Sequence, residues 1–382
     1  MSDAQSKNIL ILGGSGNTGR QIAGLLLKET DINLVLAGRN LARAQAAALE
    51  LNLQFPGERV SAISVDAADA TSLAEALSGI DLLLVASSTS AYTAEVVQAA
   101  LARRIDYLDV QYSTAKLDLL KSKENEIKAA GCCFITDGGF HPGLPAALVR
   151  YAGMHFDKLE KANVGSVIKI DWAALDIVME TVDEMLMEFR DFKTLTFQAG
   201  QWKSASMWKP MTMDFGGVFG KQPCVAMFLE EMRRLPDLLP GLQETGFYVG
   251  GFNWFVDWLV TPLAIAALRL WPRASLRPMA RLMLWGLRKF SKPPYGTLLK
   301  CEASGVKGGK PFKEELLLSH PDGYTLTAVP VVACLLQYLD GAIRQPGLWL
   351  QAQIIEPERM LADMQRMGIF ISHTEVEKRQ AS

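Results

Sequence analysis

Residues 8–27 read NILILGGSGNTGRQIAGLLL, and this stretch decides the fold of the first domain. A short apolar run ends in a glycine-rich turn, and an apolar segment with helical periodicity follows directly. The turn contains the pattern G-x-G-x-x-G at Gly14, Gly16 and Gly19. The first glycine permits a tight turn, the second lets the backbone approach a diphosphate, and the third lets helix and strand pack closely. The stretch therefore predicts a strand, a phosphate-binding turn and the N-terminus of a helix.

The same alternation of short apolar strands and longer helical segments continues to about residue 136. Strands that alternate with helices form a parallel sheet with crossover connections. We expect six strands, at residues 9–12, 34–37, 60–65, 82–85, 107–110 and 133–136. Helices are expected to begin near residues 17, 40, 70, 91 and 114. The predicted fold class is α/β, a Rossmann doubly wound parallel sheet with strand order 3-2-1-4-5-6.

A second, α+β substrate domain is expected where the alternation stops, after residue 140. Longer β-type runs there mix with amphipathic helices, and the clearest of them predict a hairpin over residues 299–318 with its turn at 305–309. The last segment returns to helical patterns and is expected to pack back on the first domain. The expected domains are 1–140, 141–328 and 329–382.

Composition limits the class of protein. The 382 residues are 49% hydrophobic and 21% charged, which is enough apolar content for two cores. A net charge of -2 gives no general attraction to nucleic acid, and we expect no such partner. The five cysteines are scattered without C-x-x-C pairing, so we expect reduced cysteines and no metal site. The short polar N-terminus runs straight into a strand, which predicts a cytoplasmic location.

The end of the second strand predicts the cofactor. NAD-selective sites place a carboxylate there, whereas this chain has Arg39 and no acid before Glu50. A guanidinium can pair with a 2′-phosphate, so NADP(H) is expected, the alternative being that Arg39 is a solvated loop charge. Asp66 and the turn after the fourth strand are further candidates, although Asp66 would equally suit a helix cap. The expected cofactor-binding residues are Gly14, Ser15, Gly16, Asn17, Thr18, Gly19, Arg39, Asp66, Ala86 and Ser87.

Residues 9–39, 106–110 (DYLDV) and 138–145 (GGFHPGLP) together resemble the saccharopine dehydrogenase-like family. The tail is similar as well, since TLTAVPV at 325–331 precedes a G-x-I-x-x-P-G step at 341–347. The resemblance implies NADP-linked oxidoreductase chemistry that forms or breaks a secondary amine through an imine. It also implies that the tail completes the first domain.

Two positions depart from the saccharopine-forming members of that family. Those members carry an aspartate where this chain has His141, and a Pro-Tyr pair where it has Ser88-Thr89. The departures argue against an amino-acid substrate. The sequence is closer to the branch of saccharopine dehydrogenase-like oxidoreductases and trans-acting enoyl reductases.

His141 is the leading candidate for the proton donor that hydride transfer requires. It follows the sixth strand in a glycine-rich loop, where we expect the imidazole to titrate near neutral pH and act as a general acid. The alternative is that His141 only caps the next helix. Tyr112 and Lys116 match the Y-x-x-x-K pattern, in which positions i and i+4 share one helix face. We interpret this match as chance, with Tyr112 facing the substrate, while a short-chain carbonyl reductase or epimerase remains the alternative.

Residues 250–292 are apolar and basic. No acidic residue lies between Asp257 and Glu302, while eight arginines and lysines lie there beside four tryptophans at positions 254, 258, 271 and 285. Residues 250–268 are nearly long enough to span a bilayer, but Asp257 and a central Pro262 make that costly. A lid over the substrate pocket and an interfacial helix at 279–290 are the two leading interpretations.

These features predict an NADP(H)-dependent oxidoreductase that acts on an apolar, lipid-like small molecule through a C=N, C=O or C=C bond. One alternative is a non-catalytic NADP(H)-binding protein docked on membranes, and another is a saccharopine-type amino-acid dehydrogenase. Peripheral membrane contact is expected through residues 250–292, and a homodimer is left open.

Overall fold

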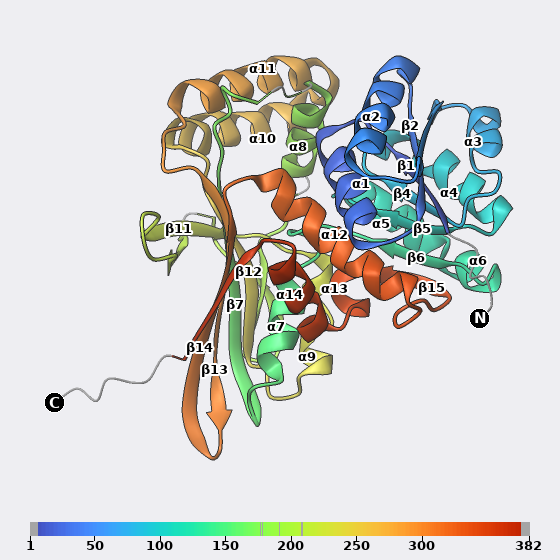
Figure 1. Ribbon diagram of the computed structural model, residues 1–382. Coiled ribbons are helices and arrows are strands. Elements are labelled where there is room, and N and C mark those ends of the chain that lie inside the picture. The colour runs from blue at the N-terminus through green and yellow to red at the C-terminus, as the bar shows by residue number, and fades with distance from the viewer. Residues whose placement is uncertain (1–6, 176, 178, 191, 208, 376–382) are drawn as a thin grey trace. The chain divides into compact units, whose positions relative to one another are not determined.

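The computed structural model describes residues 7–175, 177, 179–190, 192–207 and 209–375. The chain forms two compact units (Figure 1). Residues 1–143 and 327–356 belong to the first unit, and residues 144–326 and 357–382 to the second. Each unit therefore combines segments that lie far apart in the sequence.

The first unit contains a seven-stranded sheet in which all neighbouring strands are parallel, in the order β15-β6-β5-β4-β1-β2-β3. The strands β4, β5 and β6 are buried throughout, as expected when helices cover both faces of a parallel sheet. The predicted doubly wound fold and the order of its first six strands are confirmed. The strands are β1 (Asn8–Leu12), β2 (Asn33–Gly38), β3 (Val60–Ser64), β4 (Leu82–Val85), β5 (Asp106–Asp109), β6 (Cys133–Thr136) and β15 (Gly347–Leu350).

Three helices of this unit, α2, α3 and α5, begin at polar side chains that cap them. The side chains of Asn40, Asp69 and Ser113 each accept a hydrogen bond from a backbone N–H in the first turn of the helix that follows. The helices are α1 (Asn17–Glu29), α2 (Leu41–Gln54), α3 (Ala70–Ala76), α4 (Thr93–Arg103), α5 (Thr114–Ser122), α6 (Glu124–Ala129) and α13 (Gln351–Ile354); α12 (Gly323–Leu339) joins the two units in sequence.

The seventh strand, β15, corrects the prediction that the tail is helical. Residues 347–350 pair in parallel with β6 and extend the sheet by one strand. These four residues, between Pro346 and a helix, are too few to show the alternating pattern of a strand. Their extended conformation depends on pairing with the edge of β6.

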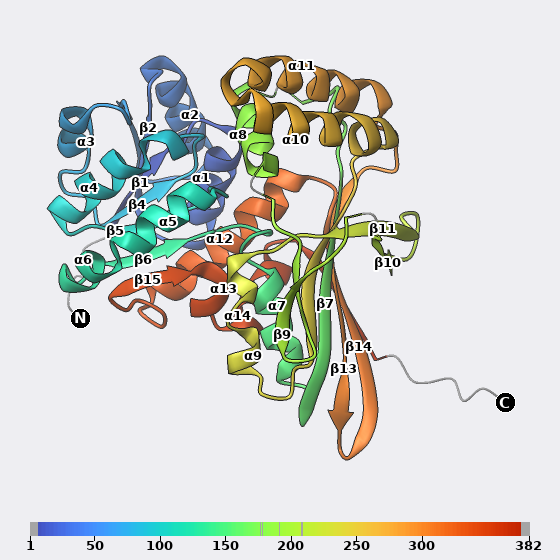
Figure 2. The same ribbon diagram turned by 180° about the vertical axis from the view of Figure 1, so that it is seen from behind.

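The second unit is built on a mixed sheet in the order β10-β11-β12-β7-β13-β14-β16; β8 also pairs with β12, and β9 pairs with β8. Figure 2 shows its long central strands. They are β7 (Lys158–Lys169), β8 (Leu195–Gln198), β9 (Gln201–Ser204), β10 (Met211–Asp214), β11 (Lys221–Ala226), β12 (Glu244–Gly250), β13 (Gly296–Lys307), β14 (Lys310–His320) and β16 (Phe370–Glu375). Its helices are α7 (Pro145–Gly153), α8 (Met179–Arg190), α9 (Leu235–Leu238), α10 (Thr261–Leu270), α11 (Pro272–Phe290) and α14 (Pro357–Arg366).

The hairpin of β13 and β14 is tighter than predicted. Lys307 pairs with Lys310, so only Gly308 and Gly309 form the turn, and both have positive φ angles (57° and 73°). A two-residue turn with both φ angles positive matches the right-handed twist of the two strands, and glycine adopts positive φ angles without strain. Residues 305–307, expected in the turn, belong to β13.

The tail is divided between the units, and this corrects the expected domain 329–382. The described residues from 357 to 375 belong to the second unit. There β16 pairs with β14 along six residues and α14 packs against α7. The free edge of β14 captures β16 because a paired edge satisfies the backbone groups of both strands.

Helices α8, α10 and α11 lie side by side and have their own apolar core, which includes Val256, Leu268 and Met283 (Figures 1 and 2). The predicted helix at 279–290 begins earlier, at Pro272. Among the described residues, no helix combines the length and the apolar character needed to cross a membrane.

Candidate functional site

The glycine-rich turn after β1 is closed by backbone contacts. The Gly13 N–H donates to the Ala37 carbonyl at the end of β2 (2.7 Å), and the Gly16 N–H donates to the Gly13 carbonyl (2.9 Å). A Cβ on Gly19 would lie 2.3 Å from the Gly13 carbonyl oxygen. Position 19 therefore excludes any side chain, which is the close packing expected of the third glycine in a phosphate-binding turn.

The N-terminus of α1 can hold an anion. Its N-cap residue is Gly16, which offers no side-chain acceptor, and no acidic residue lies in the first turn. The first N–H groups of a helix carry partial positive charge and need acceptors from outside the helix. The turn contains Gly14, Ser15 and Gly16, and the first residues of the helix are Asn17, Thr18 and Gly19. The six predicted residues therefore lie together at this helix start, and their contact with a phosphate stays a prediction.

The end of β4 lies against this turn. The Ala86 N–H donates to the Leu12 carbonyl (2.8 Å), and a Cβ on Gly13 would lie 2.7 Å from both the Ala86 carbonyl oxygen and the Ser87 Cβ. Predicted residues from two strands are therefore brought together. Gln111 was not predicted, yet its side-chain amide donates to the Ser87 carbonyl (2.6 Å) and fixes the segment after β4.

Asp66 lies at the end of β3 and is exposed. Its carboxylate accepts a hydrogen bond from the Ala68 N–H (3.0 Å), a local turn, while Asp69 caps α3. The alternative that Asp66 caps this helix is therefore wrong. Its contact with a cofactor stays a prediction.

Arg39 occupies the expected position between the end of β2 and the cap of α2. Its side chain is exposed and has no ion-pair partner among the residues that the structure describes. Arg43, which sequence reasoning missed, lies in the first turn of α2, where there is no acidic residue. The spacing R-N-x-x-R would have indicated Arg43, because side chains in the first turn of a helix point toward its N-terminus, and α2 begins just after β2.

The charge at this strand end predicts cofactor selectivity. We expect Arg39→Asp to weaken NADPH binding by roughly 10- to 100-fold, because a charge-assisted pair is lost and like charges are introduced. Binding of NADH should change less than threefold. Fluorescence titration with both dinucleotides measures the difference. The control is Arg103→Ala, at the end of α4, whose side chain donates to the Ala74 carbonyl. Equal weakening of both dinucleotides would contradict the assignment of Arg39.

A buried ion cluster at the ends of β5 and β6 was not predicted. The Lys116 ammonium lies 2.7 Å from an Asp109 carboxylate oxygen and 2.8 Å from one of Asp137, and neither Lys116 nor Asp109 has an exposed side chain. Thr136 donates a hydrogen bond to the other Asp109 oxygen (2.7 Å). Burial alone lowers the pKa of Lys116, but the attraction of the two carboxylates outweighs it and raises the pKa above its ordinary value.

This cluster removes the basis for a Tyr112–Lys116 catalytic pair. Ser113 caps α5, so Tyr112 precedes the helix and does not share a helix face with Lys116. The lysine is held inside the first unit by two aspartates and by the Gln111 carbonyl. Lys116 therefore does not support the alternative of a short-chain carbonyl reductase or epimerase. Contact of Tyr112 with the substrate stays a prediction.

The loop that carries His141 is held by one buried amide. The Gln351 side chain, on α13, donates to the carbonyls of Gly139 (3.0 Å) and Gly143 (3.2 Å) and accepts from the Gly139 N–H (3.3 Å). A Cβ on Gly143 would lie 2.4 Å from the Gly139 carbonyl oxygen, so the loop folds tightly on itself. The tail segment thus supports the loop predicted to act in catalysis.

The imidazole of His141 does not have the predicted titration. Burial lowers its pKa to about 4, so the ring is neutral near pH 7 and the expectation of a neutral pKa is wrong. The capping alternative is wrong as well, since Leu144, the N-cap residue of α7, makes no side-chain cap and Glu231 accepts the Ala146 N–H (3.0 Å). A catalytic role of His141 stays a prediction.

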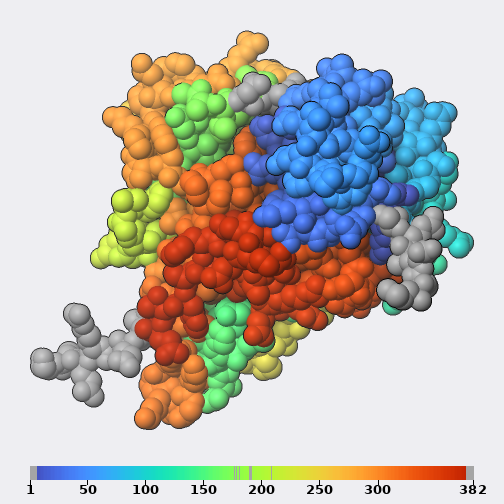
Figure 3. Space-filling view, viewed as in Figure 1, coloured from blue at the N-terminus to red at the C-terminus, as the bar shows by residue number. Residues whose placement is uncertain are grey.

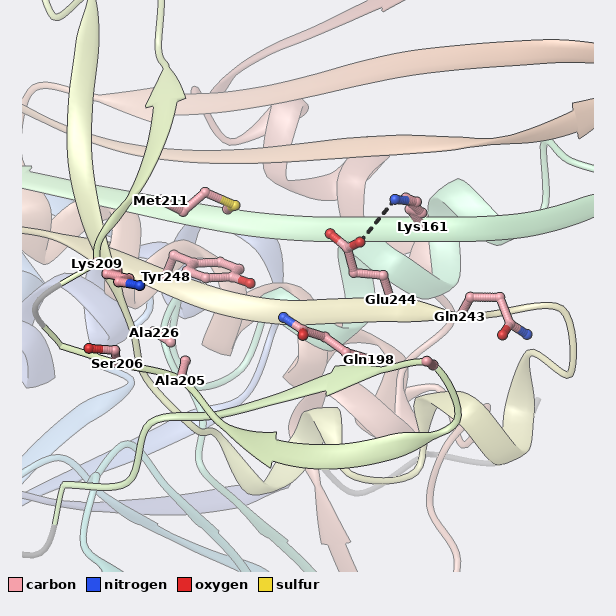
Figure 4. A pocket seen from close by; sticks show the side chains of 11 residues that line it. Lys161, Gln198, Ala205, Ser206, Lys209, Met211, Ala226, Gln243, Glu244 and Tyr248 are labelled. Carbon is pink, nitrogen blue, oxygen red and sulfur yellow. Dashed lines mark hydrogen bonds and ion pairs between the residues drawn. The ribbon is translucent and has the colours of Figure 1, made fainter.

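The second unit contains a cavity of about 530 Å³ between β7, β8, β10 and β12 (Figure 4). Its lining is polar as well as apolar and includes the ion pair of Lys161 with Glu244 (3.0 Å), and the Tyr248 ring lies beside Met211. Burial raises the pKa of Tyr248 to about 12, so its hydroxyl is protonated at neutral pH. None of the residues predicted from sequence lines this cavity.

The glycine turn, the open helix N-terminus and the guanidinium groups at the end of β2 define a dinucleotide-binding Rossmann unit. Residues 9–131 match the family model described as saccharopine dehydrogenase NADP binding domain. This part of the chain is therefore similar to the NADP-binding domain of saccharopine dehydrogenases, which confirms the predicted family resemblance and the predicted cofactor.

One curated protein and one solved structure are similar to the chain. The L-glutamate-forming, NADP(+)-linked saccharopine dehydrogenase of Saccharomyces cerevisiae is 31% identical over 159 residues, 41% of this chain and 32% of that protein. The chain thus matches about a third of the length of this curated relative. The apo structure of L-glutamate-forming saccharopine dehydrogenase from the same yeast has a TM-score of 0.69 at 17% identity, covering 97% of this chain and all (100%) of that one. At this identity the likeness shows the fold.

Proposed function

We propose that the protein is an NADP(H)-dependent oxidoreductase that acts on an apolar substrate through a C=N, C=O or C=C bond. The observation that carries the proposal is the cradle at Gly13, Gly16 and Gly19, where a Cβ at position 19 would occupy the space that the turn needs. The residues present therefore fit a dinucleotide. The match of residues 9–131 to an NADP-binding domain supports the same cofactor.

Each part of the site has a physical role in this proposal. The N–H groups at the start of α1 bind the diphosphate, and Arg39 with Arg43 hold the 2′-phosphate. The bound nicotinamide supplies the hydride chemistry. His141, neutral at pH 7, donates a hydrogen bond that polarises the substrate carbonyl or imine, because a ring with a pKa of about 4 is not an acid near pH 7. Tyr112 is the second candidate for this contact.

Turnover of NADPH tests the proposal. Purified protein is mixed with NADPH and with imine, ketone and enoyl acceptors, and a pair of an amino acid with an aldehyde represents the saccharopine-type alternative. We expect oxidation of NADPH with one acceptor class and a loss of about 100-fold in kcat in His141→Gln. A loss of kcat in Tyr112→Phe but not in His141→Gln would assign the hydrogen bond to the substrate to Tyr112. Failure with every acceptor, in protein that binds NADPH, would favour a non-catalytic dinucleotide-binding protein.

The second part of the proposal is peripheral binding to an anionic membrane, which would give access to an apolar substrate. Residues 254–285 expose a group of large apolar side chains: Trp254, Trp258, Leu259, Leu263, Leu270, Trp271 and Trp285. Figure 3 shows the surface of this region in light orange at the upper left. The opposite sides of α10 and α11 are already used by their own core with α8. Exposed tryptophans beside arginines suit the interface of a membrane with anionic lipids better than a buried lid.

Vesicle flotation tests this contact. We expect the protein to float with vesicles that contain phosphatidylserine. The double variant Trp258→Ser with Trp271→Ser should reduce the bound fraction at least fivefold, because each change removes apolar surface that the membrane would bury. The control is Leu49→Ser with Leu53→Ser on α2, where both side chains are also exposed (64% and 81%). Equal loss in both double variants, or no flotation of the unchanged protein, would contradict the membrane contact and leave the lid interpretation. A cytoplasmic location and a homodimer stay predictions.

A further inference from the structure

We propose that His155, Glu314 and His373 form a binding site for a divalent transition metal of the zinc type. His155 follows α7, Glu314 lies on β14, and His373 lies on the edge strand β16. All three belong to the second unit, so the site is independent of the dinucleotide-binding residues. Two of the four histidines of the chain thus meet at one carboxylate, which their scattered positions in the sequence did not predict.

The ligand atoms already lie close together. The Glu314 Oε2 is 2.9 Å from His155 Nδ1 and 2.8 Å from His373 Nε2, and the three ligand atoms lie within 4.8 Å of one another. Zinc bonds of about 2.0–2.1 Å in a tetrahedron place neighbouring ligand atoms about 3.3 Å apart. Each nitrogen must therefore move a few tenths of an ångström away from the carboxylate oxygen, to about 3.3 Å. The two imidazole rings are stacked, with their centroids 5.2 Å apart, and both nitrogens lie beside the same carboxylate oxygen.

The electrostatics favour a cation. The Glu314 side chain is only 2% exposed, and a buried carboxylate is costly unless a positive charge or several hydrogen bonds compensate it. A bound metal would supply the charge at Glu314 itself.

The site is open enough to load. The side chains of His155 and His373 are 25% and 36% exposed, so an ion and its water can reach the carboxylate from solvent. Imidazole nitrogen with carboxylate oxygen suits zinc, nickel or cobalt rather than calcium or magnesium. Three protein ligands leave a fourth position for water. The metal would join the end of α7 to β14 and β16 and so fasten the C-terminal strand.

Metal titration of the full chain tests the proposal. Protein is treated with EDTA, the chelator is removed, and zinc chloride is added in a calorimeter. We expect one zinc per chain with micromolar or tighter affinity and a higher melting temperature. Cobalt(II) added in place of zinc should give the visible absorption of a four-coordinate site. His373→Gln, on an exposed edge strand, should weaken zinc binding by roughly 100-fold or more, since a ligand is lost.

The matched control is His320→Gln. His320 is in the same unit and half-buried, but its Nδ1 interacts with the backbone of Asp322 (3.0 Å) and not with the cluster. This variant should bind zinc as the unchanged protein does. Two results overturn the proposal: no saturable heat with zinc, or unchanged zinc affinity in His373→Gln, which would place the ion elsewhere. In the first case the three residues form a hydrogen-bonded cluster only.

Discussion

Replacing Lys116 with methionine is expected to lower the free energy of unfolding by about 3–5 kcal/mol, because it leaves the buried carboxylates of Asp109 and Asp137 without a cation. The two side chains have similar length, so the change removes charge more than volume. Guanidinium unfolding followed by circular dichroism measures it. The control is Lys121→Met on the same helix, an exposed position, which should change stability by less than about 0.5 kcal/mol. Similar curves for the two variants would show that the cluster does not stabilise the fold.

The pH dependence gives an independent test of the same cluster. The pKa of Lys116 in the folded protein lies above the ordinary value of 10.5. The folded state therefore binds the proton more tightly than the unfolded state. The stabilisation is complete below pH 10.5 and is lost as the pH rises through the folded pKa. Between pH 9 and 12 the unchanged protein should lose more stability than Lys116→Met.

Gly19→Val is expected to weaken NADPH binding strongly and to destabilise the first unit. The new Cβ would lie 2.3 Å from the Gly13 carbonyl oxygen and 2.9 Å from the Gly14 Cα, both of them backbone atoms that cannot rotate away. Overpacking of this kind costs about 3 kcal/mol or more, which is a loss of roughly 100-fold in affinity if it falls on the phosphate turn. Fluorescence titration and thermal unfolding measure the two effects.

Gly24→Ala is the matched control on the same helix. A Cβ at position 24 would meet only Leu51 and Phe55, at 3.8 and 3.9 Å, which are ordinary contacts. Because alanine is the better helix former, stability should stay equal or rise by up to about 1 kcal/mol. NADPH affinity should not change. If Gly19→Val bound NADPH as tightly as this control, the turn would not be the diphosphate site.

Local patterns predicted most of the first unit. The runs at β1, β4 and β6 are short and continuously apolar, and the caps at Asn40 and Ser113 mark where helices begin. These signals lie within a few residues of one another, so the sequence shows them directly. The hairpin of β13 and β14 was predictable for the same reason, although its turn uses only two residues.

Long-range pairing explains what was missed. β15 and β16 are short strands whose conformation depends on the free edges of β6 and β14, which lie far away in the sequence. The support of the His141 loop depends likewise on Gln351, 212 residues from Gly139. A buried polar contact between distant segments produces no periodic pattern of residues in either segment. Sequence patterns therefore could not assign the tail to two units.

The sequence by itself determined the glycine turn, the helix that follows it and the basic end of β2, because all three are encoded within residues 9–43 and need only local backbone geometry. Tertiary structure alone decided the ionisation of His141, the ion cluster around Lys116 and the meeting of His155 and His373 at Glu314. The physical reason is that burial and charge are set by neighbours in space. A side chain's residue type is known from the sequence, but the groups that surround it are known only after folding.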